Sequence, residues 1–307
     1  MSRVFTAAAA QLGPIGRTEP RRAVVARMIE LMKRAHAAGC SFVTFPEMAL
    51  TTFFPRWHST DPVELSGYFE DSMPGPETQP LFNAAREMEI GFYLGYCERA
   101  EGPEIDRHLG YNTSILVDRA GQIVGKYRKV HLPGNPRPDA ALKLQHLEPW
   151  YFLEGDLGFP VFDTMSGRFG MLLCNDRRWP EAWRMLGLQG AEIAVLGYNS
   201  PSQLPDNPAQ NPLRKSHHLI PMQAAAYQNG LWIIASAKAG QEEGCHMMGH
   251  SCVIAPSGEV VALSSSDDDE LLPYRIDLDA TAEYKRFFDF RSYRRPAAYG
   301  LLTQTHE

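Results

Sequence analysis

Short apolar runs separated by polar, turn-forming residues follow one another along the whole chain. Such runs predict buried strands, and between several of them the apolar residues recur at helical spacing. In 21–38, for example, Val24, Met28 and Met32 fall on one face, and Gly39 ends the pattern. The predicted strands are 4–10, 41–45, 91–96, 114–117, 123–127, 169–173, 193–197, 231–237, 252–255, 260–263 and 274–278. The predicted helices are 21–38, 78–88, 180–189 and 213–228.

The order of these elements repeats weakly in the two halves of the chain: strand, helix, strand, helix, strand and then a hairpin. The hairpins are 114–127 and 252–263, where Gly121 and Gly258 suit the positive φ that short turns need. This order predicts an α/β protein in which both halves contribute helix-covered sheets to one domain, 1–307. Many large α/β chains alternate in this way, so the repeat alone does not identify the fold.

Three polar segments fall outside this pattern. The segments 133–147 and 199–212 are rich in Pro, Asn, Gln and Asp, a composition and length typical of functional or mobile loops. The run 264–270 contains only Ser, Asp and Glu, and we expect it to form a solvated turn between strands.

Composition and charge narrow the class of protein and its partners. With 44% hydrophobic and 21% charged residues, the chain matches an ordinary globular protein. Its 30 Lys and Arg against 36 Asp and Glu give a formal charge of −6, so we expect neither nucleic acid nor membrane as a partner. Five scattered cysteines fit no disulfide framework, and no apolar run has the about 20 residues of a membrane span. The apolar stretch at the N-terminus is too short for a secretory leader, so we expect a cytoplasmic protein.

Common nucleotide-binding and hydrolase motifs are absent from the sequence, which has neither G-x-G-x-x-G nor G-x-x-x-x-G-K-[ST], and neither G-x-S-x-G nor H-E-x-x-H. The residues Cys245, His246, His250 and Cys252 are candidates for a metal site. Because His250 opens a predicted strand, the two histidines do not share a helix face. Ordinary packing therefore explains the cluster better, and we expect no metal.

Cys174 differs from the other four cysteines in its position, because it stands where a buried strand runs directly into a helix starting at Pro180. A thiol there would lie near the positive end of the helix and near the guanidinium groups of Arg177 and Arg178. Both features favour thiolate over thiol. The alternative is a cysteine that packs as a small apolar residue, which is common in buried strands.

A thiolate that attacks an amide-like carbon needs a base to move its proton and a donor for the developing oxyanion. Glu47 follows strand 41–45 where the apolar run stops, so desolvation could raise its pKa. Strand alternation puts Lys126 and Arg128 on one face and Lys129 on the other. Glu47 and Lys129 are candidates for the two roles, although each alone would also fit a surface or capping position.

Three stretches resemble the Glu-Lys-Cys signature of the nitrilase superfamily of carbon-nitrogen hydrolases, in the order of that family. They are 45–47 (Phe-Pro-Glu), 125–133 (Gly-Lys-Tyr-Arg-Lys-Val-His-Leu-Pro) and 173–181 (Leu-Cys-Asn-Asp-Arg-Arg-Trp-Pro-Glu). The resemblance spans nearly the entire chain and is strongest to the N-carbamoyl-D-amino-acid amidohydrolases, or D-carbamoylases. The stretches that support this narrower match are 50–58, 145–148, 155–160, 191–199, 216–219, 227–230 and 249–252.

The resemblance implies a four-layer α-β-β-α sandwich that assembles into homodimers or homotetramers. It also implies that Glu47 is the general base, Lys129 the oxyanion donor and Cys174 the nucleophile. Glu148 matches the second glutamate of the family and would hold Lys129 and the substrate nitrogen in place. No metal or organic cofactor belongs to this chemistry. The chain departs from the family pattern at 133–147 and 200–214, and we expect both loops to border the substrate side chain.

The residues after the nucleophile indicate an anionic substrate. A guanidinium fork binds carboxylate through two hydrogen bonds, so Arg177 and Arg178 are candidates to hold an acid group a few bonds from the attacked carbon. The alternative is an arginine pair that faces solvent or an interface. His146, Asn175 and Asn199 are further candidates for hydrogen bonds around the same anion.

The resulting hypothesis is hydrolysis of an N-carbamoyl-D-amino acid to the D-amino acid, ammonia and carbon dioxide through a thioester on Cys174. One alternative is a nitrilase-superfamily amidase or nitrilase for a different carboxylate-bearing amide, and another is a catalytically idle binding member. The segment 280–307 interleaves aromatic residues with arginines, which is typical of interface cores, so we expect it in an oligomer interface. Packing of this segment against its own domain is the alternative.

Overall fold

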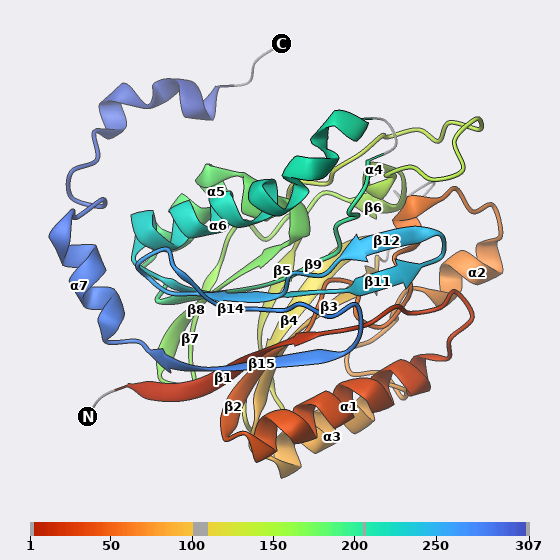
Figure 1. Ribbon diagram of the computed structural model, residues 1–307, viewed down its shortest axis with the longest axis horizontal. Helices are drawn as coiled ribbons and strands as arrows, with labels where there is room; N and C mark the ends of the chain where they lie inside the picture. The colour runs from red at the N-terminus through yellow and green to blue at the C-terminus, as the bar shows by residue number, and fades with distance from the viewer. Residues whose placement is uncertain (1–2, 101–109, 205–206, 305–307) are drawn as a thin grey trace.

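Two β-sheets lie face to face, and helices cover the outer surface of each in the computed structural model, which describes residues 3–100, 110–204 and 207–304 (Figure 1). Helices α1 and α3 cover one sheet, and α5 and α6 cover the other. The predicted four-layer α-β-β-α sandwich is therefore confirmed. The helices are α1 (Arg21–Ala37), α2 (Pro62–Gly67), α3 (Gln79–Glu87), α4 (Glu148–Tyr151), α5 (Pro180–Leu188), α6 (Arg214–Asn229) and α7 (Ala280–Phe287).

The first sheet is formed mainly by the first half of the chain, in the order β15-β1-β2-β3-β4-β5, with the short β6 paired to β4. Strands β1, β2 and β3 run parallel, whereas β4, β5 and β15 pair antiparallel to their neighbours. The bounds are β1 (Val4–Gln11), β2 (Cys40–Thr44), β3 (Gly91–Arg99), β4 (Gly110–Val117), β5 (Ile123–Arg128), β6 (Phe152–Leu153) and β15 (Glu270–Asp277).

The second sheet repeats this plan in the order β14-β13-β10-β9-β8-β7, with β8, β9 and β10 parallel and the outer strands antiparallel. The predicted repeat of the two halves is thus confirmed. The bounds are β7 (Val161–Thr164), β8 (Gly167–Leu173), β9 (Ile193–Tyr198), β10 (Trp232–Ala237), β13 (Cys252–Ile254) and β14 (Val260–Leu263); a separate hairpin consists of β11 (Ala239–Glu242) and β12 (Cys245–Met248).

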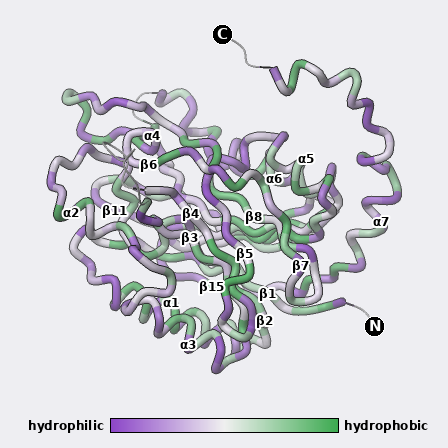
Figure 2. The backbone as a smooth tube through the Cα atoms, turned by 180° about the vertical axis from the view of Figure 1, so that it is seen from behind, coloured by the Kyte–Doolittle hydropathy of each residue, from purple (hydrophilic) through white to green (hydrophobic). Residues whose placement is uncertain are grey.

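Strand alternation explains how one strand serves two apolar layers. On β1, Ala7 and Ala9 pack into the core between the sheets, while Ala8 and Ala10 pack against α1. Across the inner core, the rings of Phe42 and Phe169 lie 5.2 Å apart. The hydrophobic residues accordingly gather along the strands, β8 among them, in Figure 2.

The predicted strands and helices are all present, and the differences concern short elements. The weak patterns of α2, α4, α7, β6, β7, β11 and β12 were not recognised in the sequence. The loop 199–212 is partly helical, because a 3-10 helix spans Pro208–Leu213. The turn 264–270 is shorter than predicted, since β15 already begins at Glu270. Among the described residues, no helix has the length and apolar character needed to cross a membrane.

The segment that follows β15 reaches beyond the sandwich. In Figure 1 it continues from α7 as an arm whose helical turns lie outside the layers. Its apolar side chains remain largely open to solvent: Phe287 is 77%, Tyr293 70% and Leu301 67% exposed. The interface prediction for 280–307 stays a prediction, and its last residues, 305–307, lie outside the described residues.

Two glycines let the sheets approach each other around the turn after β2. A Cβ atom on Gly95 of β3 would lie 2.6 Å from the Cα of Glu47, and a Cβ on Gly197 of β9 would overlap the Glu47 backbone nitrogen. We therefore expect Gly197→Ala to lower the free energy of unfolding by about 2 kcal/mol or more, since backbone cannot move aside as a side chain can. Urea unfolding and catalytic activity measure the effect.

Gly67→Ala is the matched control for this substitution, because nothing lies within 4 Å of a Cβ at Gly67 and its φ is not positive. This variant should unfold like the unsubstituted protein. If Gly197→Ala were as stable and active as Gly67→Ala, the close approach would not constrain the turn.

Candidate active site

The turn after β2 carries Glu47 into the space between the sheets. Beyond Thr44, the chain still pairs with β3: the amide of Gly95 donates to the carbonyl of Pro46 (3.1 Å), and the amide of Ala49 donates to the carbonyl of Gly95 (2.8 Å). The Glu47 side chain has no solvent exposure. The sequence prediction that its carboxylate emerges at the end of the strand, in a desolvated place, is confirmed.

Lys129 follows β5, where alternation separates it from its cationic neighbours as predicted. Lys126 and Arg128 both donate to Glu98 on the other face of the strand, at 2.6 and 3.0 Å. The Lys129 amide donates to the carbonyl of Asn112 on β4 (2.8 Å), which continues the ladder by one residue and turns its side chain inward. Its ammonium group is fully buried.

The Lys129 ammonium lies between two buried carboxylates. Its Nζ donates to Oε1 of Glu47 at 2.7 Å and to both oxygens of Glu148 at 2.8 and 2.6 Å. The Asn112 amide bridges the same two groups, donating to Glu47 at 2.8 Å and to Glu148 at 3.2 Å. Glu148 begins α4, as the first residue of a four-residue helix. One cation thus holds two acids in a fixed geometry.

Because one ammonium cannot neutralise two carboxylates, the two acids differ in pKa. Burial raises the pKa of Glu47, and Lys129 offsets this only partly while the charge of Glu148 adds to it. For Glu148, burial is outweighed by Lys129 and His146, so its pKa is lowered. Burial also opposes the charge of Lys129, but the negative charges of Cys174, Glu148 and Glu47 keep its pKa raised. Such a split would suit Glu47 to proton transfer and Glu148 to a permanent charge.

Cys174 lies in a strained turn at the end of β8. It opens the 3-10 helix Cys174–Arg178 with φ at +42°, in the left-handed region that non-glycine residues avoid at a cost of about 1–3 kcal/mol. Asp176 stabilises this turn by accepting from the Leu173 amide (3.1 Å). It also accepts from the Tyr127 hydroxyl (2.7 Å) and the His131 amide (2.9 Å), which links the nucleophile to the segment that holds Lys129.

Arg177 favours the thiolate of Cys174, as the sequence indicates, but burial outweighs it. Burial raises the pKa of the Cys174 thiol to about 11, and the charge of Glu47 adds to this, while Lys129 and Arg177 offset only part. Helix α5 begins only at Pro180, after the 3-10 turn, so its N-terminus does not follow the thiol directly. The thiol instead donates to the carbonyl of Asn199 at 3.5 Å. A base must therefore remove its proton, and Glu47 has the pKa for that role.

Comparisons with known proteins agree with this geometry. The carbon-nitrogen hydrolase model matches residues 6–286. The chain belongs to the carbon-nitrogen hydrolase family. It is 29% identical over 290 residues to an N-carbamoylputrescine amidase of Arabidopsis thaliana, covering 91% of this chain and 89% of that protein. It is 25% identical over 288 residues to a citrullinase of Francisella tularensis, covering 92% and 93%. The crystal structure of a carbon-nitrogen hydrolase from Helicobacter pylori G27 has the same fold, with a TM-score of 0.84 at 24% identity over 99% of this chain and 100% of that one.

Three predicted substrate ligands of this carbon-nitrogen hydrolase already contact other parts of the protein. The backbone amide of Asn199 donates to Oε2 of Glu47 at 3.0 Å, and its side-chain amide donates to the Glu47 carbonyl at 2.8 Å. The Asn175 amide donates to the carbonyl of His131 at 3.2 Å. His146 lies behind the acids, with its Nε2 3.1 Å from Glu148. The structure thus brings all three to the site, with contacts that position the catalytic groups.

The two arginines after the nucleophile differ in their surroundings. Arg177 is fully buried and donates to the Cys174 carbonyl (2.5 Å), the Ser200 hydroxyl (2.8 Å) and Nδ1 of His218 (3.2 Å). Arg178 makes one long bond, to the carbonyl of His217 at 3.4 Å. The charge of Arg177 and then burial lower the pKa of Arg178 to about 9. Within the described residues, neither guanidinium has an acid partner, so an anion beside them would relieve their repulsion.

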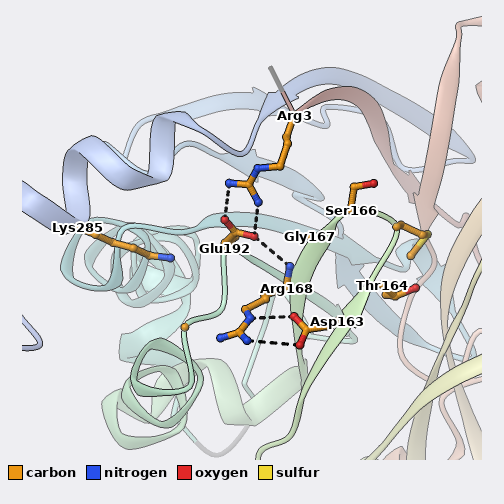
Figure 3. Close-up of a pocket in the computed structure, with 10 residues that line it drawn as sticks. Arg3, Asp163, Thr164, Ser166, Gly167, Arg168, Glu192 and Lys285 are labelled. Carbon is orange, nitrogen blue, oxygen red and sulfur yellow. Dashed lines mark hydrogen bonds and ion pairs between the residues drawn. The ribbon is translucent and has the colours of Figure 1, made fainter. Parts of the chain in front are cut away.

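A cleft elsewhere in the hydrolase shows the opposite balance of charge. This cavity of about 570 Å³ at the β7–β8 hairpin contains Arg3 and Arg168 (Figure 3). Each of these arginines lies 2.8 Å from a carboxylate oxygen, Arg3 from Glu192 and Arg168 from Asp163. Each of these two arginines is thus paired with an acid, unlike Arg177 and Arg178, whereas Lys285, which also lines the cleft, donates to the carbonyl of Ala191. As for metals, the described part of the chain has no group of three or more His, Cys, Asp or Glu arranged to hold one.

Asn112 and Asp176 are functional residues that the sequence analysis did not identify. Both are buried polar side chains that bond two or more segments of the site. The available signals were weak: Asn112 is a polar residue in a strand otherwise rich in apolar and hydroxyl side chains, and Asp176 is an acid two residues after the nucleophile. The roles of Asn112 and Asp176 become visible only from the pairing of β4 with β5 and from the close approach of the two sheets.

The pH dependence of kcat/KM should report the raised pKa of Glu47. Glu47 must be ionised to accept the Cys174 proton, so activity should fall as the pH drops through a pKa above the ordinary value of 4.5. A pH–rate profile of kcat/KM measures this acid limb. A profile that instead rises in step with thiol ionisation toward pH 11 would show that free thiolate, without Glu47, is the nucleophile.

Asn112→Asp tests the balance of charge among the buried acids. A third carboxylate beside Glu47 and Glu148 should raise the pKa of Glu47 further, which moves the acid limb to higher pH and lowers kcat/KM at pH 7 by about tenfold or more. Asn83→Asp on the outer helix α3 is the control and should leave the profile unchanged. Equal profiles for the two variants would contradict the bridging role of Asn112.

Proposed function

We propose that this enzyme hydrolyses N-carbamoyl-D-amino acids to the D-amino acid, ammonia and carbon dioxide. The observation that supports this function best is the set of arginines around Cys174 that lack an acid partner within the described residues: Arg177, Arg178 and, at the start of α6, Arg214. The charge of Arg177 and then burial lower the pKa of Arg178, and burial and then the charge of Arg177 lower the pKa of Arg214. A substrate that carries a carboxylate would neutralise them.

The first half of the reaction forms a covalent intermediate on Cys174. Glu47 accepts the thiol proton as the sulfur attacks the carbamoyl carbon. Lys129 donates to one oxygen of Glu47 and to both oxygens of Glu148, so it would give up one of its two bonds to Glu148 to donate to the developing oxyanion. Glu47 then passes the proton to the leaving nitrogen, and ammonia departs.

The second half returns the enzyme to its starting state. A water molecule gives a proton to Glu47 and attacks the thioester carbon, and the sulfur leaves and recovers the proton as a thiol. The released carbamate loses carbon dioxide and yields the free amino acid. Glu148 keeps its charge through both halves, because its lowered pKa makes it the weaker base.

The same charges argue against a cationic substrate. One relative is named for N-carbamoylputrescine, whose free end is an amine. An ammonium ion beside three uncompensated guanidinium groups would be repelled, whereas a carboxylate would be attracted. A nitrilase or amidase acting on a different carboxylate-bearing amide is the second candidate, because the arginines recognise the acid and not the bond that breaks. An idle binding role fits poorly with an intact Glu47, Lys129 and Cys174.

The remaining expectations complete the proposal. The enzyme would act as a cytoplasmic, single-domain protein spanning 1–307, with a small-molecule substrate and without a cofactor. The exposed arm 280–307 would bury its apolar side chains, such as Phe287 and Leu301, against a second subunit in a homodimer or homotetramer. Light scattering that shows a monomer would count against this assembly.

A substrate panel tests the proposed function. We expect ammonia release from N-carbamoyl-D-phenylalanine and N-carbamoyl-D-methionine at rates at least about tenfold above those of the L forms and of N-carbamoylputrescine. Cys174→Ala should abolish turnover and still bind the D compounds, which calorimetry can measure. Equal rates for both enantiomers, or turnover of nitriles alone, would exclude D-carbamoylase activity in favour of the second candidate.

A further inference from the structure

Arg56 is a buried cation that neither the catalytic triad nor the carboxylate pocket uses. It ends the 3-10 helix Phe54–Arg56, and only 3% of the residue is exposed. Its Nη1 lies 3.5 Å from Nδ1 of His146, the thiol of Cys245 is a further neighbour, and its Nε has no hydrogen-bond partner. Among the described residues, no carboxylate lies within ion-pair distance of it. A buried charge without a partner is costly, so this arrangement indicates a missing anion.

Backbone pairing places this guanidinium beside the catalytic acids. The amide of Gln145 donates to the carbonyl of Arg56 (2.7 Å), and the amide of Leu147 donates to the carbonyl of Pro55 (2.9 Å). These two bonds set His146 between Arg56 on one side and Glu148 on the other. Arg56 is therefore one imidazole ring away from the carboxylate that holds Lys129.

Arg214 brings a second uncompensated cation to the same place from α6. Its Nε donates to the carbonyl of Pro201 at 3.1 Å, next to Ser200, whose hydroxyl accepts from Arg177. Burial and then the charges of Arg177 and Arg56 lower the pKa of Arg214, while the charge of Cys174 raises it. Pro201 also pairs with Met247 of β12, and Cys245 of the same strand neighbours Arg56, so β12 joins the surroundings of the two arginines. The described residues offer Arg214 no ion pair.

We propose that Arg56 and Arg214 form a second anion site that binds an acidic group on the side chain of the substrate. This inference rests on the proposed function: Arg177 and Arg178 take the α-carboxylate, and Arg214, which adds to their charge, also takes part in the second site. It names N-carbamoyl derivatives of acidic amino acids, such as aspartate, as preferred over those of uncharged amino acids. The loops at 133–147 and 199–214 flank the two arginines, which agrees with their expected place beside the substrate side chain.

A purely structural role for Arg56 makes a different prediction. Its bond to Nδ1 of His146 could serve only to keep that ring in place, so that Nε2 faces Glu148. Loss of Arg56 would then lower kcat by the same factor for every substrate. Recognition of an acidic side chain would instead change kcat/KM for acidic substrates alone, chiefly through KM.

The test compares N-carbamoyl-D-aspartate with N-carbamoyl-D-leucine, whose side chain has nearly the same shape and no charge. We expect kcat/KM of the unsubstituted enzyme to favour the aspartate compound by about tenfold or more. Arg56→Gln should lower the aspartate value by about 10- to 100-fold and change the leucine value by less than about threefold. Arg214→Gln, whose side chain is half-buried, should lower the aspartate value by a smaller factor, and Arg56→Lys should retain part of the preference.

Each possible result decides the proposal. Arg22→Gln, an exposed arginine on α1, is the control and should leave both values unchanged. The leucine compound reports in every variant whether the fold and the triad are intact. Equal losses on both compounds in Arg56→Gln, or no preference for aspartate in the unsubstituted enzyme, would overturn the second anion site and leave the proposed function standing. Failure to hydrolyse any N-carbamoyl amino acid would overturn both.

Discussion

The catalytic arrangement depends on one buried ammonium group that must serve two carboxylates. Lys129, Glu47 and Glu148 have no solvent exposure, so they stabilise each other or not at all. The cluster is one positive charge short, and the chain compensates with the neutral Asn112 amide and with a raised pKa on Glu47. Burial and, to a smaller degree, this imbalance raise the pKa of Glu47, as its proposed role as general base requires. A second lysine in the cluster would stabilise both carboxylates and leave Glu47 too weak a base to take a thiol proton.

The raised pKa of Glu47 can affect Cys174 only because the two sheets meet closely. The Tyr93 hydroxyl donates to the carbonyl of Leu172 (2.8 Å) and accepts from the amide of Gly197 (3.1 Å), which pins the centre of one sheet to the other. Asp176 makes the second link, between the strained turn of Cys174 and the end of β5. The strained left-handed conformation of Cys174 is maintained because these contacts fix the surrounding segments in place.

The sequence correctly predicted the features that depend on hydrophobic periodicity and on the local order of residues. Alternation correctly separated Lys129 from Lys126, and the end of an apolar run correctly located Glu47, because both follow from the pleat of a single strand. The arginines that would favour a Cys174 thiolate are visible in the sequence, whereas the burial that outweighs the effect of Arg177 is not. Asn112 acquires its role from strand pairing across the sheet, which no local pattern reveals.

The arginines near the nucleophile influence catalysis as well as recognition. Arg177 lowers the pKa of Cys174, although burial and Glu47 outweigh it. An anionic substrate that neutralises these arginines would remove that help, so the bound complex holds its thiol proton more tightly than the free enzyme. Cys174 then cannot ionise on its own and reacts only when the attacked carbon and Glu47 are both in place. Burial and the charge of Glu47, and not the arginines, thus keep an idle thiolate and its side reactions out of the site.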